Sequence, residues 1–153
     1  MYYVQIDIKR DNALKLHNTG QLREAKELFN QILENNPTDF VTLFYLANIA
    51  ISAGDCIKAL EYYDKSVLIR DDIAAVWHNR GCVLQHLERY ADAVDSYDRA
   101  LKIDPDNPGS STNRDAVLEK LCQNVPLPDA VAPEAIRTTV NGADRSRDRK
   151  SVV

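Results

Sequence analysis

The residues of this chain best suited to chemistry are two histidines and a cysteine spaced four residues apart. His78, Cys82 and His86 fall on one face of a helix, because residues four apart lie one turn above each other. Imidazole nitrogen and thiolate sulfur are ligands of zinc and copper, and His17 could approach from an earlier segment. No carboxylate or second cysteine completes the set, so the pattern favours ordinary polar side chains over a metal site.

A second group of residues matches part of a calcium-binding loop. Asp104, Asp106, Gly109 and Asp115 fall at places one, three, six and twelve of that pattern. Pro108, however, stands where the loop should supply an oxygen ligand. The Asp-Pro pair is explained equally well as the end of a helix, so the sequence favours a boundary over a calcium site.

The other short motifs provide no evidence for catalysis. The sequence has no glycine-rich phosphate loop, nucleophile elbow or zinc-hydrolase motif. Lys150 to Val153 resembles a carboxy-terminal ligand of PDZ domains, but a pattern this short often occurs by chance. We therefore predict a protein that is not an enzyme and needs no cofactor.

Composition predicts one globular domain. Hydrophobic residues make up 44% of the chain and charged residues 27%. No apolar run is long enough to cross a membrane, and the first residues lack the basic and apolar regions of a secretory signal. Three cysteines, odd in number and without a CxxC pair, are typical of reduced thiols. We expect a cytoplasmic protein without membrane insertion.

The charge distribution argues against nucleic acid as a ligand. The net charge is −4, and residues 1–123 hold 19 of the 23 acidic residues but only 14 of the 19 basic ones. Phosphate binding needs a basic face, which an acidic body does not provide. The sequence therefore favours another class of partner.

The elements that position these residues follow from an internal repeat with a period of about 34 residues. The last copy, residues 74–107, carries small, aromatic and proline residues in a fixed order: Trp77, Gly81, Leu84, Ala93, Tyr97, Ala100 and Pro105. Two steps back by one period find the same classes, first at Ala47, Ala59 and Tyr63, then at Ala13, Ala25 and Phe29. Three adjoining repeats result: residues 6–39, 40–73 and 74–107.

The repeated residues suit pairs of antiparallel helices. A small residue at each of two positions per repeat allows two helices to cross closely, and an aromatic residue fills the gap to the next repeat. Gly20 and Gly54 stand where a first helix should end in a left-handed residue. Pro37 and Pro105 follow the ends of second helices.

This order of residues resembles the signature of the tetratricopeptide repeat (TPR) family. The resemblance implies an all-α fold, an α-solenoid of three helix-turn-helix pairs and a capping helix, seven helices in a right-handed superhelix. We expect the TPR domain to cover residues 6–123, preceded by an N-terminal extension at residues 1–5. Residues 124–153, which are rich in proline and charge, are predicted to be a disordered tail.

The capping helix is predicted at residues 112–123. Thr112 and Asp115 resemble a capping box, and an apolar stripe follows them. Such a helix would cover the exposed face of the third repeat, as repeat arrays require.

The resemblance also implies a function, because first helices of TPR repeats line a concave groove that binds a peptide or a partner's helix. By register, the groove residues expected here are Arg10, Leu14, His17, Val41, Phe44, Tyr45, Asn48, Ile51, His78, Asn79, Cys82 and His86. We therefore predict an adaptor for a protein or peptide partner.

The groove residues of the second repeat belong to a predicted helix that is apolar on both sides. Phe44 and Ile51 face the groove, while the opposite face already has apolar residues to bury. Either a partner covers Phe44 and Ile51, or neighbouring side chains do. Asn48 and Asn79 could bind a ligand's backbone, or they are solvated polar residues.

One specialised group of TPR proteins binds the acidic carboxy-terminus of heat-shock proteins through a clamp of basic and asparagine residues. The corresponding positions here are Arg10, Leu14, Tyr45, Ala75 and Asn79. Only Arg10 fits, and the paired cations that hold two carboxylates are absent from this set. The sequence predicts that this chain does not bind such a tail.

Two other functions stay open at this point. The chain could be a self-assembling scaffold, a homo-oligomer in which Tyr2, Tyr3 and Val4 join another copy. It also resembles secretion or assembly chaperones in size, although no motif specifies that role.

Overall fold

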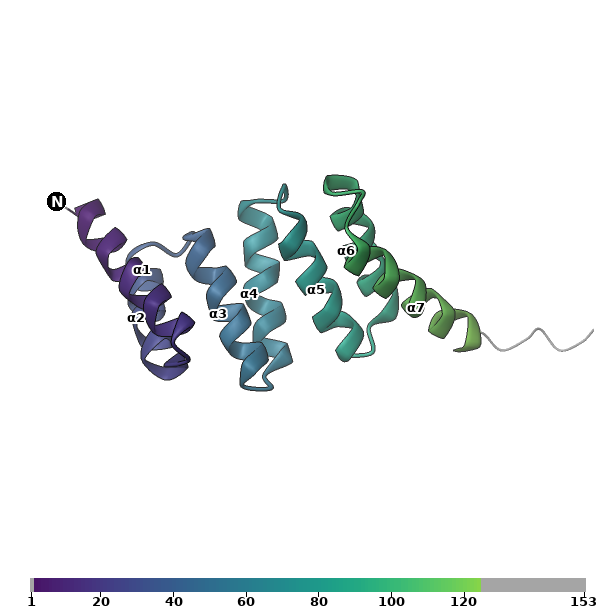
Figure 1. Cartoon of the computed structure of the whole chain (residues 1–153), viewed down its shortest axis with the longest axis horizontal. Coiled ribbons are helices and arrows are strands. Elements are labelled where there is room, and N and C mark those ends of the chain that lie inside the picture. Colours follow the sequence, from purple (N-terminus) through teal and green to yellow (C-terminus); the bar gives the residue numbers. More distant parts are fainter. Residues whose placement is uncertain (1, 125–153) are drawn as a thin grey trace, which may run out of the picture. The chain divides into compact units, whose positions relative to one another are not determined.

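The computed structural model describes residues 2–124, and the side chains of residues 5–123. This part of the chain contains seven α-helices and no strand (Figure 1). The helices are α1 (Tyr2–Asn18), α2 (Leu22–Asn35), α3 (Phe40–Ser52), α4 (Cys56–Ile69), α5 (Ala74–His86), α6 (Tyr90–Ile103) and α7 (Pro108–Asn124). None of these helices is both long and apolar enough to cross a lipid bilayer. The predicted all-α solenoid is confirmed.

The helices follow one another as a row of neighbouring pairs (Figure 1). From α1 to α6 each helix packs against the next along the chain. This order results from loops of only a few residues, which leave consecutive helices side by side. The first helices of the second and third repeats begin at Phe40 and Ala74, as the repeat register predicts.

The small and aromatic residues of the repeats form the core. The alanines at the predicted crossings and the aromatic residues Phe29, Tyr63 and Tyr97 have no exposed surface. Gly81 shows why the crossing must be small, because a Cβ added there would lie 2.6 Å from Cε1 of Tyr97. The sequence period therefore reflects one packing arrangement that is used in all three repeats.

A residue with positive φ lies in the loop after each first helix. Gly20 and Gly54 have φ of +80° and +77°, which confirms their predicted left-handed conformation. The third repeat has Glu88 at the corresponding place, with φ of +58°. A residue with a Cβ is strained in this region, so the third turn carries a cost that the first two avoid.

The start of the last helix was predicted wrongly. Helix α7 begins at Pro108 rather than at residue 112, and the predicted capping box at Thr112 lies inside it. The cap is Asn107, whose Oδ1 accepts a hydrogen bond from the Ser110 N–H at 2.9 Å. Asparagine is a preferred N-cap, and proline is favoured at the first helical position because its missing N–H is not needed there.

The first helix is also longer than predicted. Helix α1 begins at Tyr2, so residues 2–5 continue the helix and do not form a separate extension. No proline or glycine precedes Ile6, and therefore nothing in the sequence stops the helix from extending. Except for Asn124, which ends α7, the predicted tail lies outside the described residues, and so does the segment Lys150 to Val153.

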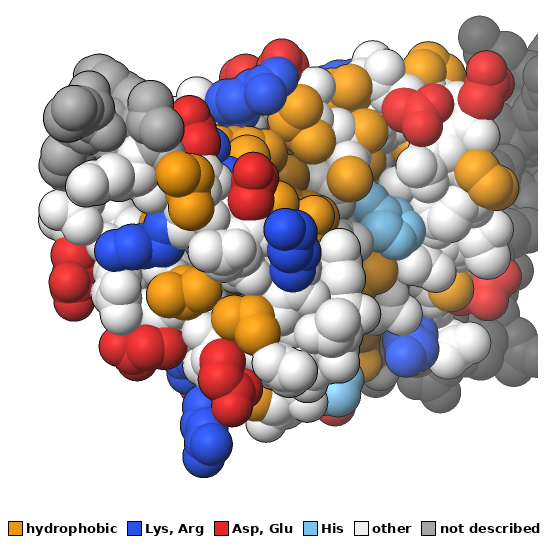
Figure 2. All heavy atoms as spheres, turned by 60° about the vertical axis from the view of Figure 1, so that its left-hand side comes forward, with side chains coloured by type: hydrophobic (Ala, Val, Ile, Leu, Met, Phe, Trp, Pro, Cys, Tyr) orange, Lys and Arg blue, Asp and Glu red, His pale blue; other side chains and the backbone are white. Residues whose placement is uncertain are grey.

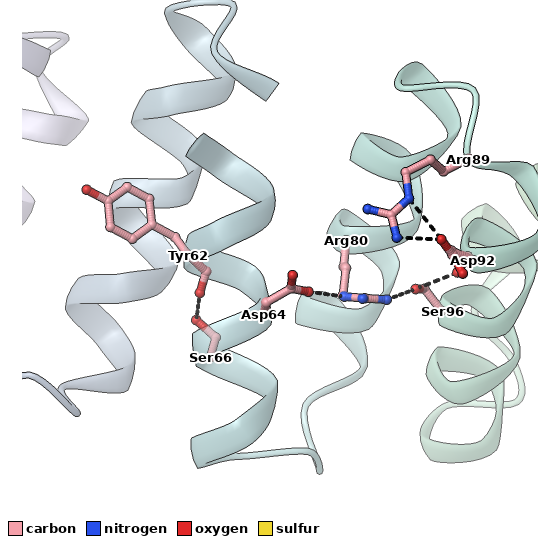
Figure 3. A network of polar contacts seen from close by, with 7 residues as sticks. All are labelled: Tyr62, Asp64, Ser66, Arg80, Arg89, Asp92 and Ser96. Atoms are coloured by element: carbon pink, nitrogen blue, oxygen red, sulfur yellow. Dashed lines mark hydrogen bonds and ion pairs between the residues drawn. The ribbon is translucent and has the colours of Figure 1, made fainter. Parts of the chain in front are cut away.

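Polar contacts join the second and third repeats (Figure 3). Arg80 on α5 donates from Nε to Asp64 Oδ1 on α4 at 2.7 Å, and from Nη1 to Ser96 Oγ on α6 at 2.7 Å. The same ion pair recurs one repeat period later, where Arg114 on α7 lies 3.3 Å from Asp98 on α6. Arg80 on α5 and Arg114 on α7 each reach the second helix of the repeat before them. Helix α7 therefore packs as the first helix of a fourth repeat would.

The strained turn yields a stability prediction. Replacing Glu88→Gly removes the Cβ from a left-handed residue, so the free energy of unfolding should rise by about 1 kcal/mol. Gly54→Ala at the equivalent turn should lower it by a similar amount. Urea denaturation followed by circular dichroism measures both, and a destabilised Glu88→Gly protein would contradict this account of the turn.

Candidate functional site

The twelve predicted groove residues share one property, which is that none of them is buried. Helix α1 carries Arg10, Leu14 and His17; α3 carries Val41, Phe44, Tyr45, Asn48 and Ile51; α5 carries His78, Asn79, Cys82 and His86. The opposite faces of the same helices hold core residues such as Ala13, Leu46 and Leu84, with at most 1% exposure. We call the accessible set the first-helix face.

Aromatic side chains dominate the part of this face formed by α1 and α3. The Tyr45 ring packs against His17 with centroids 5.0 Å apart, against Phe44 at 5.5 Å and against Phe29 at 5.7 Å. Phe44 also meets the ring of Tyr63 at 6.3 Å. Neighbouring side chains therefore half-bury Phe44, which favours the second of the two alternatives for this residue.

Two aliphatic side chains on α3 remain uncovered. Val41 is 37% exposed and Ile51 is 40% exposed, one near each end of the helix. In the view of Figure 2 hydrophobic side chains gather in a band that is bordered by charged ones. The first-helix face thus offers apolar surface whose burial would be favourable at about 25 cal/mol per Å².

The two asparagines of this face lie beside one buried tyrosine. The Tyr63 hydroxyl donates to Asn48 Oδ1 at 2.6 Å. Burial raises the pKa of the Tyr63 hydroxyl, and the Asn79 amide opposes this shift. The carbonyl oxygen of Asn48 is therefore already used inside the protein, while the side chain of Asn79 is half-buried next to the same hydroxyl.

The third repeat gathers a polar cluster with α7. His78 Nδ1 lies 2.9 Å from Ser110 Oγ, and His78 Nε2 lies 3.5 Å from Cys82 Sγ. The Asn113 amide donates to the same sulfur at 3.6 Å. Sequence reasoning missed the contribution of α7, although a further step of one repeat period from Val76 and Asn79 leads to Ser110 and Asn113.

This cluster does not assemble the metal-ligand set considered from the sequence. His78 and Cys82 lie together, but His86 is exposed one turn further along, and His17 packs on Tyr45 instead. Among the described residues no three histidine, cysteine, aspartate or glutamate side chains are grouped so that they could hold a metal ion.

Arg10 makes ion pairs with two aspartates of the first repeat. Its guanidinium donates to Asp7 Oδ1 at 2.9 Å and to Asp39. Asp39 is 6% exposed and also caps α3, because its Oδ1 accepts from the Thr42 N–H at 2.9 Å. The one clamp position that holds a cation is therefore committed to an internal carboxylate, and Leu14, Tyr45, Ala75 and Asn79 supply no positive charge.

The repeat and its packing identify the family of the chain. A family model described as the tetratricopeptide repeat matches residues 74–107. The matched segment spans α5, α6 and the loop between them, and the same arrangement recurs in α1–α2 and α3–α4. The chain is a tetratricopeptide repeat protein.

Relatives of this TPR protein support the assignment. It is 31% identical over 93 residues to the Hsp70-Hsp90 organising protein of Plasmodium falciparum, a match that covers 61% of this chain and 37% of the relative. The TPR protein thus spans little more than a third of that relative's length.

Two solved structures show the same fold at low sequence identity. The first TPR of Spaghetti (RPAP3), bound to the HSP90 peptide SRMEEVD, is 16% identical with a TM-score of 0.72; the match covers 76% of this chain and 93% of the other. The Yersinia enterocolitica type III secretion chaperone SycD, in complex with a peptide of the translocator YopD, is 14% identical with a TM-score of 0.70, covering 76% and 94%. None of these relatives is named for a catalytic activity.

The contact between His78 and α7 yields a prediction of pH dependence. Burial lowers the pKa of the His78 imidazole from its ordinary value of 6.5. As the pH falls through 6.5, the His78 imidazole binds a proton more readily in the unfolded chain than in the folded chain. His78 therefore lowers the free energy of unfolding progressively below that pH. We expect urea midpoints to decrease between about pH 7.5 and about pH 5.5.

The matched control is His78→Gln, which can still hydrogen bond but does not titrate. This variant should lose part of the decrease while keeping the remainder that other groups cause. An unchanged pH dependence in His78→Gln would show that the imidazole does not resist protonation in the fold.

Proposed function

We propose that the first-helix face binds a peptide segment or a helix of a partner protein, so that the chain acts as an adaptor. The observation that carries this proposal is the exposure of Val41 and Ile51 beside a cluster of packed aromatic rings, on a face where none of the twelve expected positions is buried. The RPAP3 and SycD structures, each with a bound peptide, support it through their shared fold. The three free cysteines are compatible with the cytoplasmic location that we propose.

The chemistry of the face favours a segment with apolar side chains. Val41, Tyr45 and Ile51 offer apolar contact area on α3, and Asn79 on α5 offers an amide that both donates and accepts. An extended or helical segment would place aliphatic side chains on α3 while its polar backbone or side-chain groups meet Asn79. Asp39 and Asp7 hold Arg10 in ion pairs, so we expect charges on the partner segment to contribute little to its binding.

A selected peptide tests this proposal directly. Peptides are selected from a phage-displayed random library against the wild-type chain, and the Kd of the best peptide is measured by fluorescence anisotropy. We expect Val41→Asp and Asn79→Ala each to raise the Kd by about tenfold or more, because each removes apolar or hydrogen-bonding contact from the first-helix face.

Leu68→Asp is the matched control for this experiment. Leu68 is 87% exposed on α4, a second helix, so its replacement should change the Kd by less than about twofold. Circular dichroism melting curves establish that all variants are folded. Full affinity in the Val41→Asp/Asn79→Ala double variant would refute the assignment of the first-helix face.

The peptide SRMEEVD, seen on the RPAP3 domain, provides a second test. Its acidic end needs several cations, and the chain has only Arg10 at those positions, paired with buried Asp39. We expect no binding at about 1 mM peptide, with the RPAP3 domain as positive control. A Kd below about 100 μM would mean that the face recognises carboxylates by groups other than this clamp.

A further inference from the structure

The first repeat exposes one side chain whose equivalents in the later first helices and in α7 are all buried. Ile8 on α1 is 57% exposed. Steps of one repeat period lead to Thr42, Val76 and Ser110, and each of these has 0% exposure. Helices α3 and α5 each pack against the second helix of the preceding repeat, whereas no described helix precedes α1.

A groove lies at this end of the array, between α1 and α2. Its volume is about 440 Å³, and its walls include the apolar side chains Ile6, Ile8 and Leu28, four amide side chains and Lys9. Leu28 corresponds to Tyr62, which packs into the core cluster of the preceding repeat. In Figure 2, where this end comes forward, hydrophobic side chains appear between polar ones. This end of the array thus carries apolar residues at positions that form contacts between repeats further along the chain.

The groove and its edge carry charges of both signs. Lys9 is the charged residue of the groove wall, and it makes no ion pair among the described residues. Glu27 is exposed on α2, one turn before the wall residue Gln31, so the two lie on the same side of the helix. A cation therefore lies in the wall on α1, and a carboxylate lies at the edge on α2.

Charges of opposite sign on the two helices allow this surface to face a second copy of itself. A two-fold axis placed between Lys9 and Glu27 would bring Lys9 of each copy to Glu27 of the other. The same rotation would place Ile8 and Leu28 of both copies against each other. The described second helices of this chain already pack against first helices within the array, so none of them is free to fill the groove.

The expected contact area is that of a weak dimer. Helices α1 and α2 have 17 and 14 residues, which correspond to lengths of about 25 and 21 Å. A pair of helices of this length and about 20 Å in width would bury roughly 1,000 Å² in total over two copies. That area lies at the low end for specific interfaces and is typical of reversible association.

We propose that the groove between α1 and α2 is a self-association surface, on which two copies pack face to face about a two-fold axis. Ile8 and Leu28 form the apolar centre of the contact, and Lys9 pairs with Glu27 of the second copy at each side. This surface is separate from the first-helix face, so dimer formation and peptide binding can be tested independently.

Sedimentation equilibrium over about 5–500 μM tests the proposal with the full chain. We expect the wild-type mass to rise from monomer to dimer with concentration. Lys9→Glu and Glu27→Lys should each raise the dimer Kd by about tenfold or more, because each places like charges together at both sides of the axis. The double variant Lys9→Glu/Glu27→Lys should restore the Kd to within about threefold of the wild type.

Two matched controls complete the experiment. Lys65→Glu reverses an exposed lysine on α4 and should leave the mass profile unchanged. Ile8→Asp should abolish the dimer, whereas Leu68→Asp, at a side chain even more exposed, should not. The selected peptide should bind Ile8→Asp as it binds the wild type, which shows that the variant is folded.

Three results would overturn the proposal. The first is a wild-type chain that stays monomeric throughout, which would leave the groove to a helix of another protein. The second is a dimer that persists unchanged in Ile8→Asp. The third is a double charge variant that associates no better than the single variants, because a two-fold contact requires the swapped charges to pair again.

Discussion

The close approach of two helices at residues with little or no side chain is the constraint on which this structure depends. At each crossing an alanine or glycine of one helix faces the next, and an aromatic residue of the second helix fills the space beside it. At Gly81 the ring of Tyr97 occupies the volume that a Cβ would need. Because every pair of helices is built this way, each first helix presents the same side to the core and the same side to solvent, and the first-helix face is a consequence.

The repeat allowed most of the fold to be predicted from the sequence. The crossings at Ala13, Ala47 and Gly81, the left-handed glycines and the starts of α3 and α5 all follow from a single sequence period. The two ends of the array could not be predicted in the same way. Helix α1 continues to Tyr2 and α7 starts at Pro108, since the length of a terminal helix depends on local stop signals and caps that have no copies to align.

The exposure of the candidate residues was predictable, but their interactions were less so. Register alone placed twelve accessible residues on the first helices, as the exposure of Val41 and Ile51 illustrates. It did not reveal that Arg10 is bound by Asp39, that Asn48 accepts from Tyr63 or that Ser110 reaches His78. These contacts depend on side-chain directions between residues far apart in the chain, and a periodic pattern contains no information about them.

The repeats are alike in backbone but joined by different chemistry. Where Arg80 pairs with Asp64 and Arg114 with Asp98, the corresponding residues between the first two repeats are Leu46 and Asn30. Salt screens a partly exposed ion pair, so rising ionic strength should weaken the contacts of Arg80 and Arg114. The positions equivalent to these two ion pairs between the first and second repeats carry no charge, so this part of the response to salt is confined to the later junctions.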